Sequence, residues 1–197
     1  MPNTSKATLT CSRCGAKFTV DTYSSINVAA DPELKEKVKS GELFMHECPQ
    51  CGNANLARHT TLYHDPEQKI LICLTDQPLS SDGLEGYTCR LVSDVGSLIE
   101  KVKIFDAGLD DLAVEMCKYV TKMEMEKSDI ELKFLKMDGA DGEITMTYPQ
   151  DGKMEMIVIG SNVYDDCCGI ISRNPALKEK ATGLVKVDGV WLSQYLR

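Results

Sequence analysis

Alternation of apolar and polar positions predicts five β-strands in the first 75 residues of the chain. The predicted strands cover Lys17–Val20, Tyr23–Val28, Leu43–His46, Leu56–Tyr63 and Lys69–Thr75. A short helix is expected between the second and third strands, with Asp31 as its N-cap, Pro32 as its first residue and Gly41 just beyond its end. Leu34 and Val38 would form its narrow apolar face.

From Asp94 the apolar spacing becomes that of a helix, and Asp106-Ala107-Gly108 interrupts it. A second helix is expected to follow and to continue to about Met125. The apolar positions are Leu98, Ile99, Val102 and Phe105 in the first helix, and Leu109, Leu112, Met116 and Val120 in the second. The pattern therefore predicts a helical pair joined by a short turn.

Beyond Ser128 the spacing returns to alternation and predicts a small antiparallel sheet. Its alternating positions are Ile130, Leu132 and Phe134, then Ile144, Met146 and Tyr148, then Met154, Met156 and Val158. Hairpin turns are expected at Asp138-Gly139, Asp141-Gly142 and Asp151-Gly152. The methionines of the third run are expected to face the core. A short helix capped by Asn174 and Pro175, a strand near Leu184–Val187, and a docked last helix that begins at Asp188 and carries Trp191, Leu192 and Tyr195 complete the chain.

Charge and composition narrow the classes of partner. The chain of 197 residues has a net charge of −8, and residues 1–75 hold equal numbers of basic and acidic side chains, so residues 76–197 carry all of it. Nucleic-acid binding depends on clustered Lys and Arg, so an acidic surface makes it unlikely. No apolar run approaches the roughly 20 residues of a membrane helix. Met1–Thr10 lacks an apolar signal segment, and we expect a cytoplasmic protein.

Four of the nine cysteines form two matched pairs, Cys11-Ser12-Arg13-Cys14-Gly15 and Cys48-Pro49-Gln50-Cys51-Gly52. Two residues between thiolates make a tight turn, and the following glycine can adopt a positive φ. Two such turns would supply four thiolates to one closed, structural Zn²⁺ site, with Cys11, Cys14, Cys48 and Cys51 as ligands. Redox Cys-x-x-Cys motifs or unligated thiols are the alternatives, although redox motifs open a helix and do not come in pairs.

The two cysteine pairs and several neighbouring segments resemble the bacterial CpXC domain, named for its Cys-Pro-x-Cys motif. The further matching segments are Ser25-Ile26-Asn27-Val28, Pro32-Glu33-Leu34-Lys35, Gly41-Glu42-Leu43, Leu62-Tyr63-His64-Asp65 and Ile104-Phe105-Asp106-Ala107-Gly108-Leu109-Asp110-Asp111. The likeness is good over residues 7–126 and weaker beyond. Only the second pair has the proline, at Pro49; Ser12 occupies that place in the first pair. The resemblance implies a zinc-binding fold and no established activity.

Three other groups of residues are candidate sites. Asp111 and Glu115 lie one helical turn apart beside Asp110 and could share a cation, but a solvated acidic first turn with Glu115 near Lys118 is the favoured interpretation. His46 could lie beside the zinc ligands or be an alternative ligand, although a surface or strand position is favoured. His64-Asp65-Pro66 is expected to form a hairpin turn. No role is assigned to His59.

The five remaining cysteines are the third group. Cys73, Cys89 and Cys117 are expected to be buried, and Cys167 and Cys168 follow two aspartates that should raise their pKa values and oppose nucleophilic chemistry.

Together these patterns predict an α+β fold: a zinc ribbon with an inserted helix, a helical pair and a small antiparallel sheet. The expected parts are residues 1–76, 77–128 and 129–197, unless they form one continuous domain, with residues 76–88 as the best boundary. We expect a non-enzymatic protein-interaction or regulatory module with a protein partner. The sequence also allows a homo-oligomer. The alternatives are an enzyme whose active site is invisible in sequence, and a weak nucleic-acid-binding ribbon using Lys17, Lys35, Lys37, Lys39 and Arg58.

Overall fold

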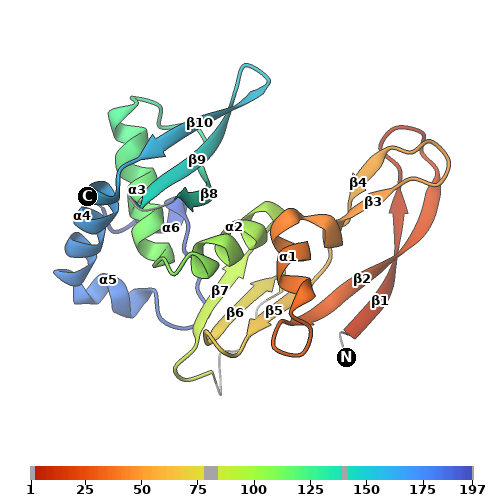
Figure 1. Cartoon of the computed structure of the whole chain (residues 1–197), viewed down its shortest axis with the longest axis horizontal. Helices are drawn as coiled ribbons and strands as arrows, with labels where there is room; N and C mark the ends of the chain where they lie inside the picture. Colours follow the sequence, from red (N-terminus) through yellow and green to blue (C-terminus); the bar gives the residue numbers. More distant parts are fainter. Residues whose placement is uncertain (1–2, 78–83, 139–141, 197) are drawn as a thin grey trace. The chain divides into compact units, whose positions relative to one another are not determined.

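The computed structural model describes residues 3–77, 84–138 and 142–196, and it shows the predicted mixture of helices and sheets (Figure 1). The chain divides into two compact units, residues 1–102 and 103–197, which are described one at a time. The proposed boundary at residues 76–88 includes residues 78–83, which lie outside the described residues.

The first unit is built on a five-stranded sheet with the order β1-β2-β5-β6-β7. β1 pairs antiparallel with β2, β2 parallel with β5, β5 antiparallel with β6, and β6 parallel with β7. A separate two-stranded antiparallel ribbon is formed by β3 and β4. The strands are β1 (Asn3–Thr10), β2 (Lys17–Asn27), β3 (Met45–Glu47), β4 (Ala54–Leu56), β5 (Thr61–Asp65), β6 (Ile70–Leu74) and β7 (Thr88–Val92).

Several strand predictions in this unit need correction. The predicted strands 17–20 and 23–28 are one strand, β2, which pairs along its length with the unpredicted β1. The predicted strand 56–63 is the end of one strand and the start of another: β4 ends at Leu56 and pairs with β3, and β5 begins at Thr61 in the five-stranded sheet. Leu43 and Phe44 belong to a single 3₁₀ turn, η1 (Glu42–Phe44), rather than to a strand. β7 was not predicted.

The inserted helix is confirmed as α1 (Glu33–Ser40), which buries Leu34 and Val38. Gly41 ends it with a φ of 80°, a conformation that glycine adopts without steric cost. The predicted N-cap is one residue too early, because Pro32 occupies that position and no side chain caps the helix. The core of this unit includes Ile26, Phe44, Ile72, Leu74 and Leu98, all nearly free of solvent contact.

The predicted helical pair is confirmed as α2 (Val95–Asp106) and α3 (Asp111–Glu124). Asp94 starts α2 by accepting hydrogen bonds from the backbone N–H and the hydroxyl of Ser97. Asp110 caps α3 in the same way by accepting from the N–H of Leu112. Short polar side chains before an apolar run are therefore sufficient to place both helix starts.

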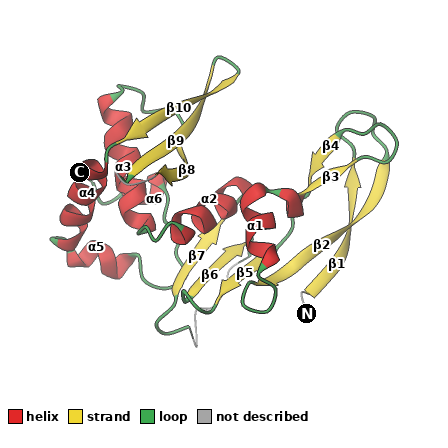
Figure 2. Cartoon of the chain, viewed as in Figure 1, coloured by secondary structure: helices red, strands yellow, loops and turns green. Residues whose placement is uncertain are grey.

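The second unit packs helices against a three-stranded antiparallel sheet, drawn in yellow beside the red helices in Figure 2. The sheet order is β10-β9-β8, with β8 (Lys133–Asp138), β9 (Glu143–Gln150) and β10 (Lys153–Ile159). The remaining helices are α4 (Ser161–Ser172), α5 (Pro175–Lys180) and α6 (Gly189–Ser193). The shared core includes Ala113, Cys117, Ile144, Met146, Ile171 and Leu192.

Local signals in the second unit are mostly confirmed. Asp151 and Gly152 have φ values of 51° and 74°, as a two-residue hairpin turn requires. Asn174 is the N-cap of α5, and Asp188 caps α6 by accepting from the N–H of Trp191. Gly139 and Asp141 of the other two predicted turns lie outside the described residues.

Three expectations for this unit are wrong. α4 was not predicted, and residues 184–187 form no strand, only an isolated bridge at Val185. Met154 and Met156 do not face the core: their exposed fractions are 63% and 67%. The alternating pattern predicted the strand correctly, but the face that packs toward the core carries Ile157 and Ile159 instead of the methionines. No helix in the described ranges is long and apolar enough to cross a membrane.

Docking of α6 is expected to contribute measurably to the stability of the second unit. Leu192 has no exposed surface, so Leu192→Ala should lower the free energy of unfolding by about 2–5 kcal/mol. Val190 lies on the same helix with 75% exposure, so Val190→Ala should change it by less than about 0.5 kcal/mol. Urea unfolding followed by circular dichroism measures both, and equal effects of the two substitutions would show that α6 is not docked through Leu192.

Candidate metal centre

The two Cys-x-x-Cys segments fold into turns of the same design. Cys11–Gly15 follows β1, and Cys48–Gly52 follows β3. In each turn the N–H of the glycine donates to the carbonyl of the first cysteine, at 3.0 Å for Gly15 and 2.8 Å for Gly52. Both glycines have positive φ, 74° and 68°, which explains why glycine follows each pair. The first cysteine of each turn is also held by its own N–H, which donates to Ala16 and Asn53 respectively.

These turns bring the four predicted ligand sulfurs together. The Sγ atoms of Cys11, Cys14, Cys48 and Cys51 all lie within 4.8 Å of one another. Two of the distances between the turns are 3.6 Å, from Cys11 to Cys51, and 3.7 Å, from Cys14 to Cys48. Cys11 and Cys48 are buried, whereas Cys14 is exposed and Cys51 is intermediate. The arrangement is a four-thiol cluster that could hold a metal ion, with one side open to solvent.

Asn55 on β4 ties the two turns together, and the sequence patterns did not identify it. Its side chain is buried, and its Oδ1 accepts from the backbone N–H of Ser12 at 2.9 Å and from the Ser12 hydroxyl at 3.2 Å. Its Nδ2 donates to the carbonyl of Asn53 at 2.7 Å and lies 3.8 Å from the Cys11 sulfur. One amide therefore fixes both the first turn and one sulfur. The sequence pattern cannot show that Asn55 lies buried against the first cysteine turn, because this depends on where β4 lies.

The thiols of Cys11 and Cys51 differ in how readily they ionise. The backbone N–H groups of Cys14 and Arg13 lower the pKa of the Cys11 thiol to about 6, against the opposing effect of burial. At Cys51 the N–H of Asn53 lowers the pKa, but burial and the thiols of Cys14 and Cys11 outweigh it and raise the value to about 12. Metal binding drives thiols to thiolates, so a bound cation would oppose the raised pKa of the Cys51 thiol.

The histidines lie outside the four-sulfur cluster. His46 on β3 pairs across the ribbon with Asn55, and its Nε2 is buried without a hydrogen-bond partner. His59 packs against Phe44, and burial lowers its pKa. His64 is in β5 rather than in a turn, and its Nε2 lies 3.2 Å from the Tyr87 hydroxyl. The hairpin turn occupies residues 66–69, after Asp65, whose carboxylate accepts from the N–H of Gln68.

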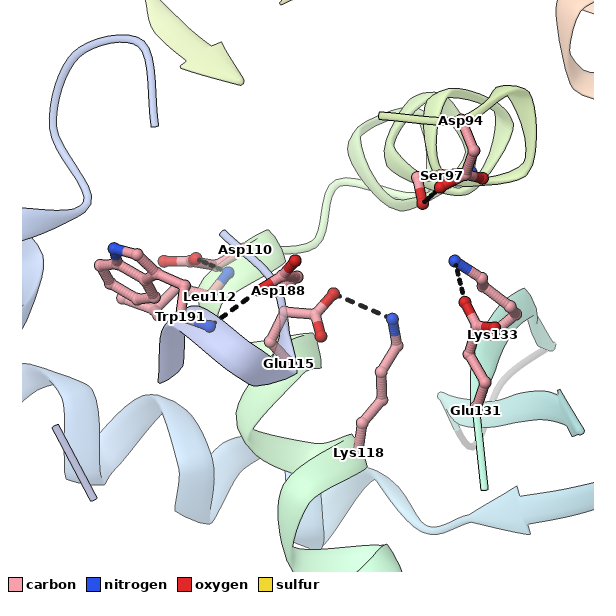
Figure 3. Close-up of polar contacts among 10 residues, drawn as sticks. All are labelled: Asp94, Ser97, Asp110, Leu112, Glu115, Lys118, Glu131, Lys133, Asp188 and Trp191. Carbon is pink, nitrogen blue, oxygen red and sulfur yellow. Dashed lines mark hydrogen bonds and ion pairs between the residues drawn. The ribbon is translucent and has the colours of Figure 1, made fainter. Parts of the chain in front are cut away.

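The acidic start of α3 is not the solvated turn that the sequence favoured. Asp110 is exposed and acts as the cap, but Asp111 and Glu115 are only 1% and 4% exposed. The expected contact between Glu115 and Lys118 is present at 2.9 Å, and Lys118 is buried too (Figure 3). A buried charge requires a partner, so this pair is part of the packing of the second unit.

The five other cysteines lie outside the four-sulfur cluster. Cys73, Cys89 and Cys117 are buried as predicted. Burial raises the pKa of Cys73 to about 11 and that of Cys89 above its usual value. Burial and then the carboxylates of Asp110 and Asp165 raise that of Cys168. The expectation fails at Cys167, where a hydrogen bond with the Cys117 thiol lowers the pKa and raises that of Cys117.

A family model described as CpXC protein matches residues 9–118, which is more than half of the chain and includes all four clustered cysteines. No curated protein and no solved structure matches.

The side chain of Asn55 is expected to stabilise the first unit. Asn55→Ala leaves the N–H of Ser12 without its acceptor, so the free energy of unfolding should fall by about 1–3 kcal/mol. Asn162→Ala, at an exposed position of α4, is the matched control and should change it by less than about 0.5 kcal/mol. Chemical unfolding of both variants is the measurement, and an Asn55→Ala protein as stable as the control would remove the role of Asn55 at the centre.

Proposed function

The chain belongs to the CpXC family, and from this premise we propose that its four clustered cysteines bind one structural zinc ion and that the protein is a non-catalytic interaction or regulatory module. The observation that carries the proposal is the convergence of four sulfurs within 4.8 Å from two matched turns. No other group of three or more His, Cys, Asp or Glu side chains with this spacing occurs in the described part of the chain.

The donor set fits zinc in both chemistry and spacing. Four thiolates are a donor set typical of structural zinc sites. Zn–S bonds of about 2.3 Å in a tetrahedron place neighbouring sulfurs about 3.8 Å apart. The 3.6 Å and 3.7 Å distances between the turns are close to that value. Zinc held by four thiolates keeps no open position for a substrate, so its contribution is a cross-link between the two turns.

This cross-link supports the smallest part of the fold. β3 and β4 have three residues each, and a two-stranded ribbon of this size is not stable alone in water. Cys48 and Cys51 follow β3 directly and precede β4, so an ion held there would close the ribbon at its end. Cys11 and Cys14 would attach the same point to the turn between β1 and β2. The two hairpins would then act as a zinc ribbon with α1 inserted between its two turns.

Charge supports a protein partner ahead of nucleic acid. Three of the five basic side chains considered for phosphate binding have carboxylate partners: Lys35 with Asp65 at 2.9 Å, Lys39 with Glu36 at 2.9 Å, and Arg58 with Asp76 at 2.6 Å. These contacts compensate part of the positive charge that a phosphate backbone would require. The net charge of −8 falls entirely in residues 76–197 and favours a protein surface as the binding partner.

Metal analysis tests the zinc proposal. Tag-free protein purified without chelator should contain about one zinc per chain by mass spectrometry, because one four-thiolate set binds one ion. Cys11→Ser combined with Cys48→Ser should lose the metal and lower the midpoint of thermal unfolding, since both side chains are buried ligands. Cys168→Ser is the matched control, because Cys168 lies on α4 outside the cluster, and it should retain the full zinc content.

Two outcomes would contradict this proposal. One is metal-free protein whose four clustered thiols react freely with a thiol reagent and whose unfolding midpoint is unaffected by added zinc. The other is a strongly coloured protein with iron in place of zinc, since tetrahedral sulfur sites also suit iron. An absorption spectrum of the purified protein separates iron from zinc directly.

Affinity capture tests the interaction role. Tagged full-length protein recovered from its native host after nuclease treatment should carry a stoichiometric protein partner, identified by mass spectrometry. The same capture with the Cys11→Ser, Cys48→Ser variant should lose that partner if the metal-fixed ribbon supports binding. Recovery of nucleic acid in place of protein, with binding that weakens steeply as salt rises, would favour the nucleic-acid alternative. Recovery of neither would contradict the interaction role.

A further inference from the structure

The outer strand of the second sheet presents an apolar row to solvent. β10 is the edge strand in the order β10-β9-β8. Met154, Met156 and Val158 occupy alternate positions along it, so their side chains point to one face. Their exposed fractions are 63%, 67% and 57%. Edge strands are usually protected by charge, proline or a covering element, and a row of large apolar side chains on one is therefore unusual.

The backbone of the same three residues faces outward. The two-residue turn at Asp151-Gly152 is closed by the pair Gln150 and Lys153. In such hairpins the closing pair exchanges hydrogen bonds, and bonded and non-bonded pairs then alternate along the ladder. Met154, Met156 and Val158 fall in the non-bonded pairs, so their N–H and C=O groups point away from β9. Pro149, which has no N–H, lies opposite Met154, as this assignment allows.

The sequence of β10 is self-complementary in one antiparallel register. With Met156 opposite Met156 of a second copy, Met154 lies opposite Val158 on each side of the two-fold axis. Lys153 then lies opposite Ile159, and Glu155 opposite Ile157, so no like charges lie directly opposite each other. The three outward-facing residues of each strand would form bonded pairs, giving about six backbone hydrogen bonds.

Other symmetric registers use the strand less well. Centring on Glu155 places two carboxylates opposite each other, which is destabilising. Centring on Met154 leaves Val158 opposite Gln150 in the turn-proximal part of β9, and centring on Val158 leaves Met154 without a strand residue opposite it. The register centred on Met156 is the one that uses all seven residues of β10.

We propose that β10 is a self-association edge, through which a second copy of this chain pairs antiparallel about Met156 and the two three-stranded sheets become one. The apolar row of each copy would lie beside that of the other on one face of the joined sheet. The surface lies in residues 153–159, beyond the residues 9–118 matched by the family, and it does not rest on the zinc site.

Sedimentation velocity of the full-length wild-type protein over a range of concentrations tests the proposal. A reversible monomer–dimer equilibrium is expected. Met156→Lys places two ammonium groups opposite each other at the two-fold axis and should raise the dissociation constant at least tenfold, about 1.4 kcal/mol. Met123→Lys is the matched control, because Met123 is exposed to 63% on α3, and it should leave the dimer unchanged.

Hydrogen exchange distinguishes strand pairing from other modes of association. The amides of Met154, Met156 and Val158 should become protected as concentration rises, and Met156→Lys should remove that protection. A wild-type protein that stays monomeric at every concentration would overturn the proposal. So would a dimer that Met156→Lys does not weaken, or one in which these three amides exchange as fast as in the monomer.

Discussion

The first unit depends on bringing four sulfurs from two distant turns to one point. Cys11 and Cys14 lie at the end of the long β1–β2 hairpin, while Cys48 and Cys51 lie at the end of a ribbon with only three residues in each strand. Ordering such a short ribbon costs conformational entropy that its few backbone hydrogen bonds do not offset. The convergence of the sulfurs, together with the amide of Asn55, is what gives this ribbon a fixed partner.

Features set by neighbouring residues were predictable from the sequence, and features set by strand pairing and packing were not. The cysteine turns, α1 with its glycine stop, and the capped starts of α2 and α3 depend on residues within a few positions of one another. β1 was missed because Asn3–Thr10 is mostly polar and shows little apolar alternation, although it pairs with the next strand, β2. β7 was missed because its place is set by parallel pairing with β6. The one-turn spacing of Asp111 and Glu115 favoured a solvated helix start. Both carboxylates are buried, and this depends on packing that the sequence does not show.

The same limit applied to which face of a strand is buried. In β10, one face carries Met154, Met156 and Val158, and the other face becomes apolar over the second half of the strand, at Ile157 and Ile159. Period-two spacing identifies the strand but cannot choose between two apolar faces. The choice is made by the helices that cover one side of the sheet, where Ile157 and Ile159 join the core. For this reason the exposed row on β10 was predicted to face the core. The role of Asn55 could not be predicted either, because it depends on the position of β4.

The length of β2 has a mechanical consequence. β2 pairs with β5 only through Ser25, Ile26 and Asn27, and the carbonyl of Tyr23 also accepts from the Thr61 hydroxyl. Among the described strands, Lys17 to Thr22 pair with β1 alone. At about 3.3 Å per residue, these six residues form a projecting arm of roughly 20 Å with the cysteine cluster near its far end. A change of about ten degrees in the twist or bend at its base would displace that end by roughly 3–4 Å. A small change in the twist or bend of the sheet would therefore cause a larger displacement of the cysteine cluster. Conversely, a partner bound at the cluster could change the twist of the sheet.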